Sequence, residues 1–600
     1  MAASRLLGSD RRLRPFSHRG ALWAVAVWLI VGTGVLAPEA QADWINLSGA
    51  EVAPHIAEVH VDREGVQVDL EIFPPQSAAF ADLLPESSGQ PPSEGAQTTL
   101  SIRTPDRCEL TPRVEVVEPR TREDRRSPYA GMINPSTGRR APEPPADDRV
   151  LYLQLFYAFG DCGQPDALVI EPPTDADGIA AATIGFITYH AGVPVTDFRY
   201  LGSPVTLVLD WDDPWYSAFE NPNLRRHHRY PVMSFIYAEP FEIRHEVLLR
   251  VRDAAELIGL QPAGSALTAE EIERLLSLTP ELVAERSPMT IDGMTVVPER
   301  GRTAFMRVGL YGLEMLEDDE AVDVDATILG LIFSVPVEGL PGTASVEWTI
   351  YTDRIQEVPS TAIDWAGPML GVLTPDDRVN VWTNYFIDQE DPVPTPVRAK
   401  LAAQFDVPVL SVFMLILGIA LGIAAARARS WARLRWASAA LAAVVVAGLV
   451  GKTAVVPVKL PTARLPSSEA TAAVVAPLVE NTGMAMLRPD DIGFDQALAT
   501  FVVSDAVPAV GSEIRRGLGV TLPSGARARV DEIDAFTIED VTAQDEGFGV
   551  LASWTSRVSG GHWGHAHRRE IRYRALMDVV EIDGLWKLRG LTVLSARPSA

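Results

Sequence analysis

One stretch in the second half of the chain limits what the whole protein can be. Residues 407–426 form a run of about 20 residues without an ionisable side chain, the length that a helix needs to cross a bilayer core. A second apolar run, 436–451, continues past Lys452 to Val456. In lipid, backbone amides must be satisfied within the segment, so both runs are expected to be helical. The sequence therefore predicts a transmembrane helical hairpin over residues 406–456.

The alternative for this stretch is a buried hairpin in a soluble protein, because Gly418, Gly422 and Gly448 would suit close packing in either setting. A soluble core helix, however, seldom lacks a polar face over so many residues. Short loops rich in arginine stay in the cytoplasm, so both soluble parts of the chain are expected on the opposite side. The arginines of the predicted loop are Arg427, Arg429, Arg433 and Arg435.

Residues 1–42 are typical of an export signal. Basic residues precede the apolar segment 21–36, and Ala40-Gln41-Ala42 is a candidate cleavage site before Asp43. An uncleaved anchor is the alternative, and in either case the residues that follow would be exported. We therefore expect the lipid bilayer of a bacterial inner membrane as one partner, with the soluble domains on the periplasmic side.

Cys108 and Cys162 are the only two cysteines of the chain. In an oxidising compartment an isolated pair of this kind is expected to form a disulfide. Two separate buried thiols are the alternative.

The charge of the chain excludes one class of partner. There are 79 Asp and Glu residues against 52 Lys and Arg residues, which gives a net charge of −27. Binding to nucleic acid requires a basic face for the phosphates, so no nucleic-acid partner is expected.

The patterns on either side of the hairpin predict a multidomain protein with two β-sandwich-like modules. Residues 43–235 contain many short segments of alternating apolar and polar residues bounded by turn signals. Residues 236–386 predict a second β-rich module, in which a capping box at 268–271 opens a short helix through Leu278. Polar, proline-containing linkers are expected at 387–405 and 457–469.

Residues 470–600 predict a separate α+β domain in which helices precede long antiparallel strands. The expected helices are 495–503 and 506–516, and the expected strands are 527–532, 548–558, 567–580 and 586–594. Gly560-Gly561 is the expected turn between two of the strands. This order of elements and the ending Asp583-Gly584-Leu585-Trp586-Lys587 resemble the cone-shaped NTF2-like and cystatin-like domains.

Two further segments resemble an uncharacterised family of bacterial membrane-anchored envelope proteins with this layout. They are Leu-Asp-Trp-Asp-Asp-Pro-Trp-Tyr at 209–216 and Gly-His-Trp-Gly-His at 561–565. The resemblance covers most of the chain. It implies a class of protein, but it does not imply a particular activity.

Three histidines form the sharpest candidate site, since neutral imidazoles bind Zn or Cu. On a regular strand His565 and His567 share a face, and His562 could fold over from the turn. The alternative is that these histidines stabilise the hairpin by packing and hydrogen bonding.

Asp210, Asp212 and Asp213 are a weaker candidate site, for calcium, because clustered carboxylates bind this hard cation. Their spacing lacks the glycine and the distal glutamate of a known calcium loop, and a solvated strand end is the alternative. The basic segment 225–229 is a candidate contact for lipid headgroups or an acidic partner, or else a salt-bridged loop.

The sequence contains no motif of a hydrolase nucleophile, a phosphate-binding loop, a zinc protease or a dithiol redox site. The leading hypothesis is therefore a non-enzymatic, membrane-anchored periplasmic binding or scaffold protein with a protein partner in the envelope. The alternatives are a periplasmic metal-binding protein that uses the histidine cluster, and a hydrolase or isomerase that acts in the C-terminal cone.

Overall fold

The structure is a computed structural model that describes residues 48–598. The gaps in this description are 84–99, 126–130, 132, 134–139, 141, 227, 310–311, 387–389, 400–404, 430, 450–454, 459–465, 521–527 and 545. The chain divides into two compact units, residues 1–42 and 43–600. The predicted signal peptide lies outside the described residues, so every element below belongs to the second unit.

The N-terminal module contains two sheets that share one apolar core. Its strands are β1 (His55–Asp62), β2 (Gly65–Ile72), β3 (Ser101–Arg103), β4 (Glu109–Leu110), β5 (Pro112–Thr121), β6 (Arg149–Ala158), β7 (Ala167–Glu171), β8 (Ile184–His190), β9 (Val193–Pro194), β10 (Arg199–Tyr200), β11 (Val205–Val208) and β12 (Ala218–Phe219). One sheet has the order β10-β8-β1-β2-β6-β5, and the other has the order β12-β11-β7-β3-β4. Val66, Val68 and Leu70 alternate along β2 and are fully buried, as the sequence pattern predicts.

Cys108 and Cys162 form the expected disulfide, with 5.9 Å between their Cα atoms. The two residues are 54 positions apart, and the closed loop includes β5 and β6. In the chain-entropy account, a loop of this size stabilises the fold by about 4 kcal/mol.

The second module is built on a seven-stranded sheet with the order β18-β17-β19-β14-β13-β21-β22 and a smaller sheet with the order β16-β15-β20-β23. The bounds are β13 (Val232–Glu239), β14 (Glu242–Arg250), β15 (Met289–Ile291), β16 (Met294–Val296), β17 (Glu299–Gly309), β18 (Gly312–Met315), β19 (Thr327–Pro336), β20 (Thr343–Glu347), β21 (Val358–Asp364), β22 (Gly367–Leu373) and β23 (Val379–Thr383). The helices are α2 (Val251–Leu257) and α3 (Ala269–Arg286).

The predicted capping box opens α3, because Thr268 Oγ1 accepts from the Glu271 amide and Glu271 Oε2 accepts from the Thr268 amide. The helix runs to Arg286 and is longer than the sequence suggests. Leu275, Thr279 and Val283 recur every four residues and are fully buried, so packing extends the helix past its expected end.

The central strands of the large sheet are buried on both faces, which is unusual for a mainly antiparallel sheet. Val232, Val247 and Leu249 belong to a core shared with α2 and α3. Met233 and Phe235 belong to another cluster on the same sheet, which also contains Trp215 of the N-terminal module and Trp563 of the C-terminal module. The second module therefore packs against both of the others.

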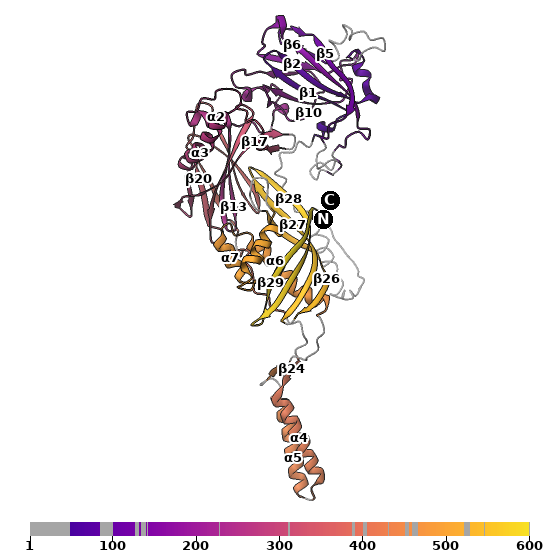
Figure 1. Ribbon diagram of the computed structural model, residues 1–600, viewed down its shortest axis with the longest axis vertical. Helices are drawn as coiled ribbons and strands as arrows, with labels where there is room; N and C mark the ends of the chain where they lie inside the picture. The colour runs from indigo at the N-terminus through magenta and orange to yellow at the C-terminus, as the bar shows by residue number, and fades with distance from the viewer. Residues whose placement is uncertain are drawn as a thin grey trace, which may run out of the picture. The chain divides into compact units, whose positions relative to one another are not determined.

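Two apolar helices, α4 (Val409–Arg427) and α5 (Trp431–Leu449), form the predicted hairpin and lie side by side (Figure 1). Both are long and apolar enough to cross a membrane. Ser411 Oγ donates to the Ala447 carbonyl over 2.7 Å, and Gly418 allows the close approach of Ala440 and Val444. The helix α5 begins five residues earlier than the expected span and so includes Arg433 and Arg435. All four loop arginines are exposed.

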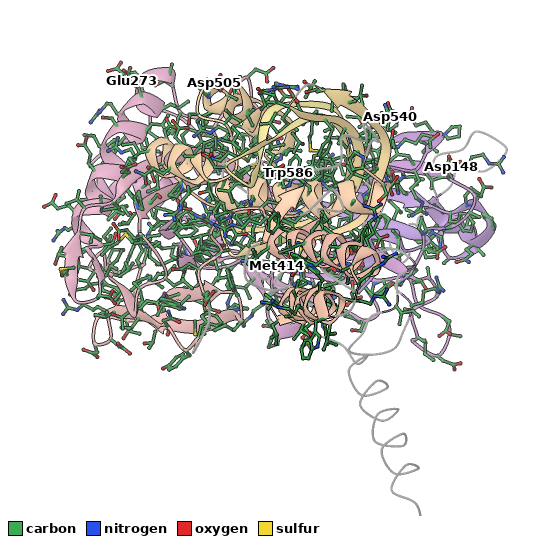
Figure 2. All side chains as sticks on the ribbon, turned by 90° about the horizontal axis from the view of Figure 1, so that it is seen from below. Asp148, Glu273, Met414, Asp505, Asp540 and Trp586 are labelled. Atoms are coloured by element: carbon green, nitrogen blue, oxygen red, sulfur yellow. A yellow bond between two sulfur atoms is a disulfide. The ribbon has the colours of Figure 1, made fainter. Side chains whose placement is uncertain are left out.

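A two-stranded ribbon closes the base of this hairpin. Strand β24 (Phe405–Pro408) precedes α4, and β25 (Val455–Val458) follows α5. They pair antiparallel, with Phe405 opposite Val458. Most large side chains of α4, such as Phe413, Ile416 and Ile419, point outward and are exposed, and Figure 2 labels Met414 on the same helix. This large exposed apolar surface fits contact with lipid rather than with water.

The C-terminal module packs three helices against a four-stranded antiparallel sheet of long strands (Figure 1). The helices are α6 (Ser468–Ala485), α7 (Asp491–Ala499) and α8 (Val507–Glu513), and the strands are β26 (Arg529–Gln544), β27 (Gly547–His562), β28 (His565–Ile582) and β29 (Leu585–Pro598). The first helix was not expected from the sequence. Pro477 inside the helix argues against a helix in the sequence. The helix is also largely buried, so its apolar residues do not alternate with polar ones at a helical period.

The predicted turn at Gly560-Gly561 is wrong. Strand β27 continues to His562, and Trp563-Gly564 forms a two-residue turn with φ angles of 46° and 80°. Positive φ at both central residues is the geometry of a tight hairpin turn, but tryptophan rarely adopts it. Its tertiary contacts, described below, stabilise the turn here.

The expected linker 387–405 is partly bound to the C-terminal module. Val397 forms a β-bridge with Trp586, and the Trp586 indole donates to the Ala399 carbonyl over 2.8 Å. Thr395 and Asn481 exchange two hydrogen bonds of 2.9 and 2.7 Å. Figure 2 labels Trp586, the residue around which these contacts gather. The chain is therefore fixed to the C-terminal module shortly before it enters the hairpin.

Candidate functional site

The tip of the β27–β28 hairpin inserts into the second module. The Trp563 side chain is 1% exposed and packs among Phe235, Tyr237 and Met306. Gly330 of β19 lies directly beneath it, because a Cβ atom at that position would lie 2.8 Å from the indole ring. The hairpin thus acts as a knob, and the face of the large sheet provides the hole.

Backbone hydrogen bonds fix this knob. The Trp563 amide donates to Glu246 Oε2, and the Gly564 amide donates to the Tyr237 hydroxyl over 2.9 Å. Arg244 donates to the Gly561 carbonyl over 2.7 Å. The three residues of the second module that form these hydrogen bonds lie on β13 and β14, two strands joined by a tight turn.

A buried charge network surrounds the same contact. Arg244 donates to Glu246 over 2.6 Å and to Glu242 over 3.1 Å, and its guanidinium lies 4.6 Å from the centre of the Tyr237 ring. Glu246 is fully buried, and burial raises the pKa of its carboxyl, although the nearby Arg244 charge and the Trp563 amide oppose the rise. The network leads to a polar cleft of about 280 Å³, lined also by Arg529 and Asp490 of the C-terminal module.

A second ion network joins the N-terminal and second modules at Asp213. Arg250 donates to both carboxylate oxygens of Asp213 over 3.1 Å, and Arg354 donates over 2.7 Å. The side chains of Asp213 and Arg250 are 6% and 1% exposed. Burial opposes charge on Asp213, but the hydrogen bonds and charges of the arginines outweigh it and lower the pKa of this carboxyl.

The proposed calcium cluster has a different use in this geometry. Asp213 is saturated by guanidinium groups, and Asp210 Oδ1 accepts from the amides of Asp212 and Asp213. Asp212 is exposed. The three residues therefore close a corner and anchor it to the second module.

The basic segment 225–229 is also largely structural. Arg226 is 4% exposed, stacks 3.8 Å from the Trp215 ring and donates to the carbonyls of Pro194 and Trp215. Burial lowers the pKa of Arg226 to about 9. His228 packs edge-on against the same ring, whereas Arg225 and Arg229 are exposed. His227 lies outside the described residues.

The histidine cluster is only partly described. His562 is buried beside Trp563, with 5.1 Å between the two ring centres, and the β ladder places it opposite His565. The side chains of His565 and His567 lie outside the description. Among the side chains that are described, no group of three or more His, Cys, Asp and Glu residues could hold a metal ion.

The space between the helices and the sheet of the C-terminal module is filled by apolar side chains. Trp554, Tyr573, Phe548 and Trp586 occupy its core, and each is at most 6% exposed. Aromatic rings stack within it, with 5.6 Å between the centres of Trp554 and Tyr573. A filled core of this kind leaves no interior space for a substrate between these side chains.

Among the residues that the structure describes, two Ser–His hydrogen bonds occur elsewhere. His190 Nδ1 lies 2.7 Å from Ser217 Oγ, and His245 Nε2 lies 3.0 Å from Ser234 Oγ. All four side chains are at most 5% exposed, so a substrate has no access to them. They are structural pairs, in which a neutral histidine satisfies a hydroxyl.

Comparison with known proteins adds no assignment. No protein-family model matches this chain, and no curated protein is similar to it in sequence. The interpretation therefore depends on the geometry alone.

Acid is expected to destabilise the fold through three buried histidines. Burial lowers the pKa of His55 and His190 to about 4 and that of His245 to about 3, against 6.5 for a solvated histidine. The unfolded chain then takes up protons at a higher pH than the folded protein, so stability present above pH 6.5 is lost as the pH falls towards 4. Each histidine contributes about 3 kcal/mol to this loss, since a shift of one pKa unit corresponds to about 1.4 kcal/mol.

Chemical denaturation of the wild type and of His245→Gln at several pH values measures this effect. We expect a shallower pH dependence in the variant, because one of the three protonation steps is removed. His60→Gln is the control, since His60 is partly exposed and stacks on Tyr189 at the surface of the sheet. Equal slopes for the wild type and His245→Gln would contradict the prediction.

Proposed function

We propose that this chain is a membrane-anchored binding or scaffold protein of the bacterial inner membrane, with its soluble modules on the periplasmic side. One observation carries the proposal: segments before and after the apolar hairpin in sequence are bound to each other. Trp563 inserts into a sheet made of residues that precede the hairpin, and Val397 pairs with Trp586. Such contacts require both ends of the hairpin to lie on the same side of any membrane that it enters.

A two-helix hairpin meets this requirement, because an even number of spans returns the chain to the side from which it came. The positive-inside bias then favours a cytoplasmic position for the loop that contains Arg427 and Arg433. The disulfide between Cys108 and Cys162 supports an oxidising compartment for the modules. These three features agree with export of both soluble parts.

A binding role is favoured over catalysis by what the described residues do. The buried carboxylates at the module junctions are engaged by arginines, and the buried histidines are paired with serines or packed. A rigid assembly with these structural networks suits the display of surfaces near a bilayer. We therefore infer that its task is to hold or recruit another envelope protein.

Replacing residues 405–458 by a short Gly-Ser linker tests the anchor. Since Phe405 and Val458 face each other in the ribbon, a short linker is able to join the flanking segments. We expect the variant to leave the membrane fraction and keep the cooperative unfolding of the intact protein. The full-length chain is the control and should stay with membranes after an alkaline carbonate wash. A variant that stays with the membranes although residues 1–42 have been removed would refute the role of the hairpin.

Crosslinking in native membranes followed by mass spectrometry tests the binding role. The proposal expects one envelope protein to be recovered repeatedly at fixed sites on the modules. Recovery of intramolecular crosslinks alone, under conditions in which the crosslinking reaction has gone to completion, would contradict the binding role.

A further inference from the structure

The outer face of the C-terminal sheet carries two arginines that directly oppose each other. Arg572 of β28 pairs with Arg597 of β29 in the ladder, and both are exposed. Side chains directly opposite on antiparallel strands lie about 5 Å apart at Cβ, and like charges in this position are destabilising. The chain as a whole is strongly acidic, with a net charge of −27, so carboxylates are plentiful.

Other arginines of the same sheet have acidic partners. Arg557 contacts Glu532 over 2.6 Å and also Asp534, Arg574 contacts Glu539 over 2.8 Å, and Arg589 contacts Asp578 over 2.7 Å. Within the part of the chain that the structure describes, Arg572 and Arg597 have no such carboxylate. Among the described residues Arg568 and Arg569 also have no carboxylate partner, but they stand opposite Ser559 and Val558 rather than opposite another cation.

The opposed pair borders a pocket of about 530 Å³. Arg574 forms part of the wall, where Glu539 holds its guanidinium through two contacts of 2.8 Å. Ser553 and Ser595 lie on either side of Arg574 in the ladder. The Ser553 hydroxyl bonds to Glu539, and Ser595 adds a hydroxyl donor to the pocket. A pocket of this size suits a small organic molecule rather than a bare ion.

We propose that this pocket binds a phosphate group, carried by a small phosphomonoester or by a phospholipid headgroup. Two guanidinium groups that have no carboxylate partner in the described part of the chain match the planar, paired hydrogen-bonding pattern that phosphate oxygens accept. The hydroxyl of Ser595 adds a neutral donor to the site. The bound anion offsets the repulsion between Arg572 and Arg597, which explains why an acidic chain keeps them opposed. Binding of a soluble phosphomonoester at this site is independent of the topology and of the partner proposed above, whereas binding of a headgroup rests on the proposed membrane anchor.

Thermal unfolding of the full-length protein in detergent tests the site, with inorganic phosphate compared against chloride at equal ionic strength. We expect phosphate to raise the melting temperature of the wild type by about 2 °C or more at concentrations well above its dissociation constant. The double variant Arg572→Gln/Arg597→Gln should melt no lower than the wild type in chloride and should not respond to phosphate. Arg557→Gln is the matched control, since it removes an arginine of the same sheet outside the pocket, and it should respond as the wild type does.

Nanodiscs distinguish the two sources of the phosphate group. A melting temperature higher in discs with phosphatidylglycerol than in discs with phosphatidylcholine alone, in the wild type but not in the double variant, identifies a headgroup. A response to soluble phosphate only identifies a phosphomonoester. The proposal is overturned if neither form stabilises the wild type, or if the double variant responds as strongly as the wild type.

Discussion

Replacing Trp563 by alanine is expected to lower the free energy of unfolding by about 4 kcal/mol, because removal of a fully buried tryptophan leaves a large cavity. The cavity forms between modules, among Phe235, Tyr237 and Met306, so the loss should also weaken the contact between the C-terminal and second modules. Denaturant titration of the detergent-solubilised protein measures the free energy of unfolding. Limited proteolysis reports the weaker contact between the modules, as faster cleavage between them.

The matched variant for this test is Trp563→Phe, which keeps an aromatic ring and most of the buried area. We expect a loss well below that of the alanine variant and no change in proteolysis. Arg568→Ala, on the exposed part of the same hairpin, should have almost no effect. If Trp563→Ala unfolds at the same denaturant concentration as the wild type, insertion of the β27–β28 hairpin does not stabilise the protein. The described packing of the C-terminal module against the second module is then wrong.

Replacing Asp213 by alanine is expected to cost about 3 kcal/mol. Removing one partner of a buried ion pair leaves the other charge without compensation, and such losses are typically 3–5 kcal/mol. The lower end applies because Arg250, whose side chain is 1% exposed, keeps Asp253 as a second partner. Denaturant titration measures the effect.

Asp212→Ala is the control for this variant, since the adjacent carboxylate is exposed and forms no ion pair with an arginine in the described part of the chain. Its free energy of unfolding should stay within about 0.5 kcal/mol of the wild type. Equal losses for the two variants would mean that the Asp213 network does not join the modules. Added calcium should leave the melting temperature of the wild type unchanged, because Asp213 already has its full set of cationic partners.

Local rules predicted part of this fold well. The hairpin follows from the length and composition of two apolar runs, because a helix that crosses a bilayer requires a continuous apolar segment of a set length. The disulfide follows from the presence of only two cysteines, and the start of α3 follows from a capping box within four residues. Each of these features depends on residues close together in sequence or on composition alone.

The module junctions could not be predicted in the same way. Trp563 and Glu246 are 317 positions apart, and Asp213 and Arg354 are 141 positions apart. In sequence, the indole belongs to a histidine-rich turn and the aspartate to an acidic cluster, so both suggested metal sites. The pattern of β14 pointed the other way, because its charged residues alternate with Ile243, Val247 and Leu249, which is typical of a strand with one solvent-exposed face. The structure buries both faces, so Arg244, Glu246 and Arg250 need partners from elsewhere.

The central claim is that both soluble parts of the chain lie on one side of a membrane that the hairpin enters, and alkaline phosphatase fusions test it most directly. The enzyme is active only after export, so it reports the side of each fusion point. The account predicts an active fusion after Pro598 and an inactive fusion after Ala428, in the arginine loop. An inactive fusion after Pro598 together with an active fusion after Ala428 would contradict it.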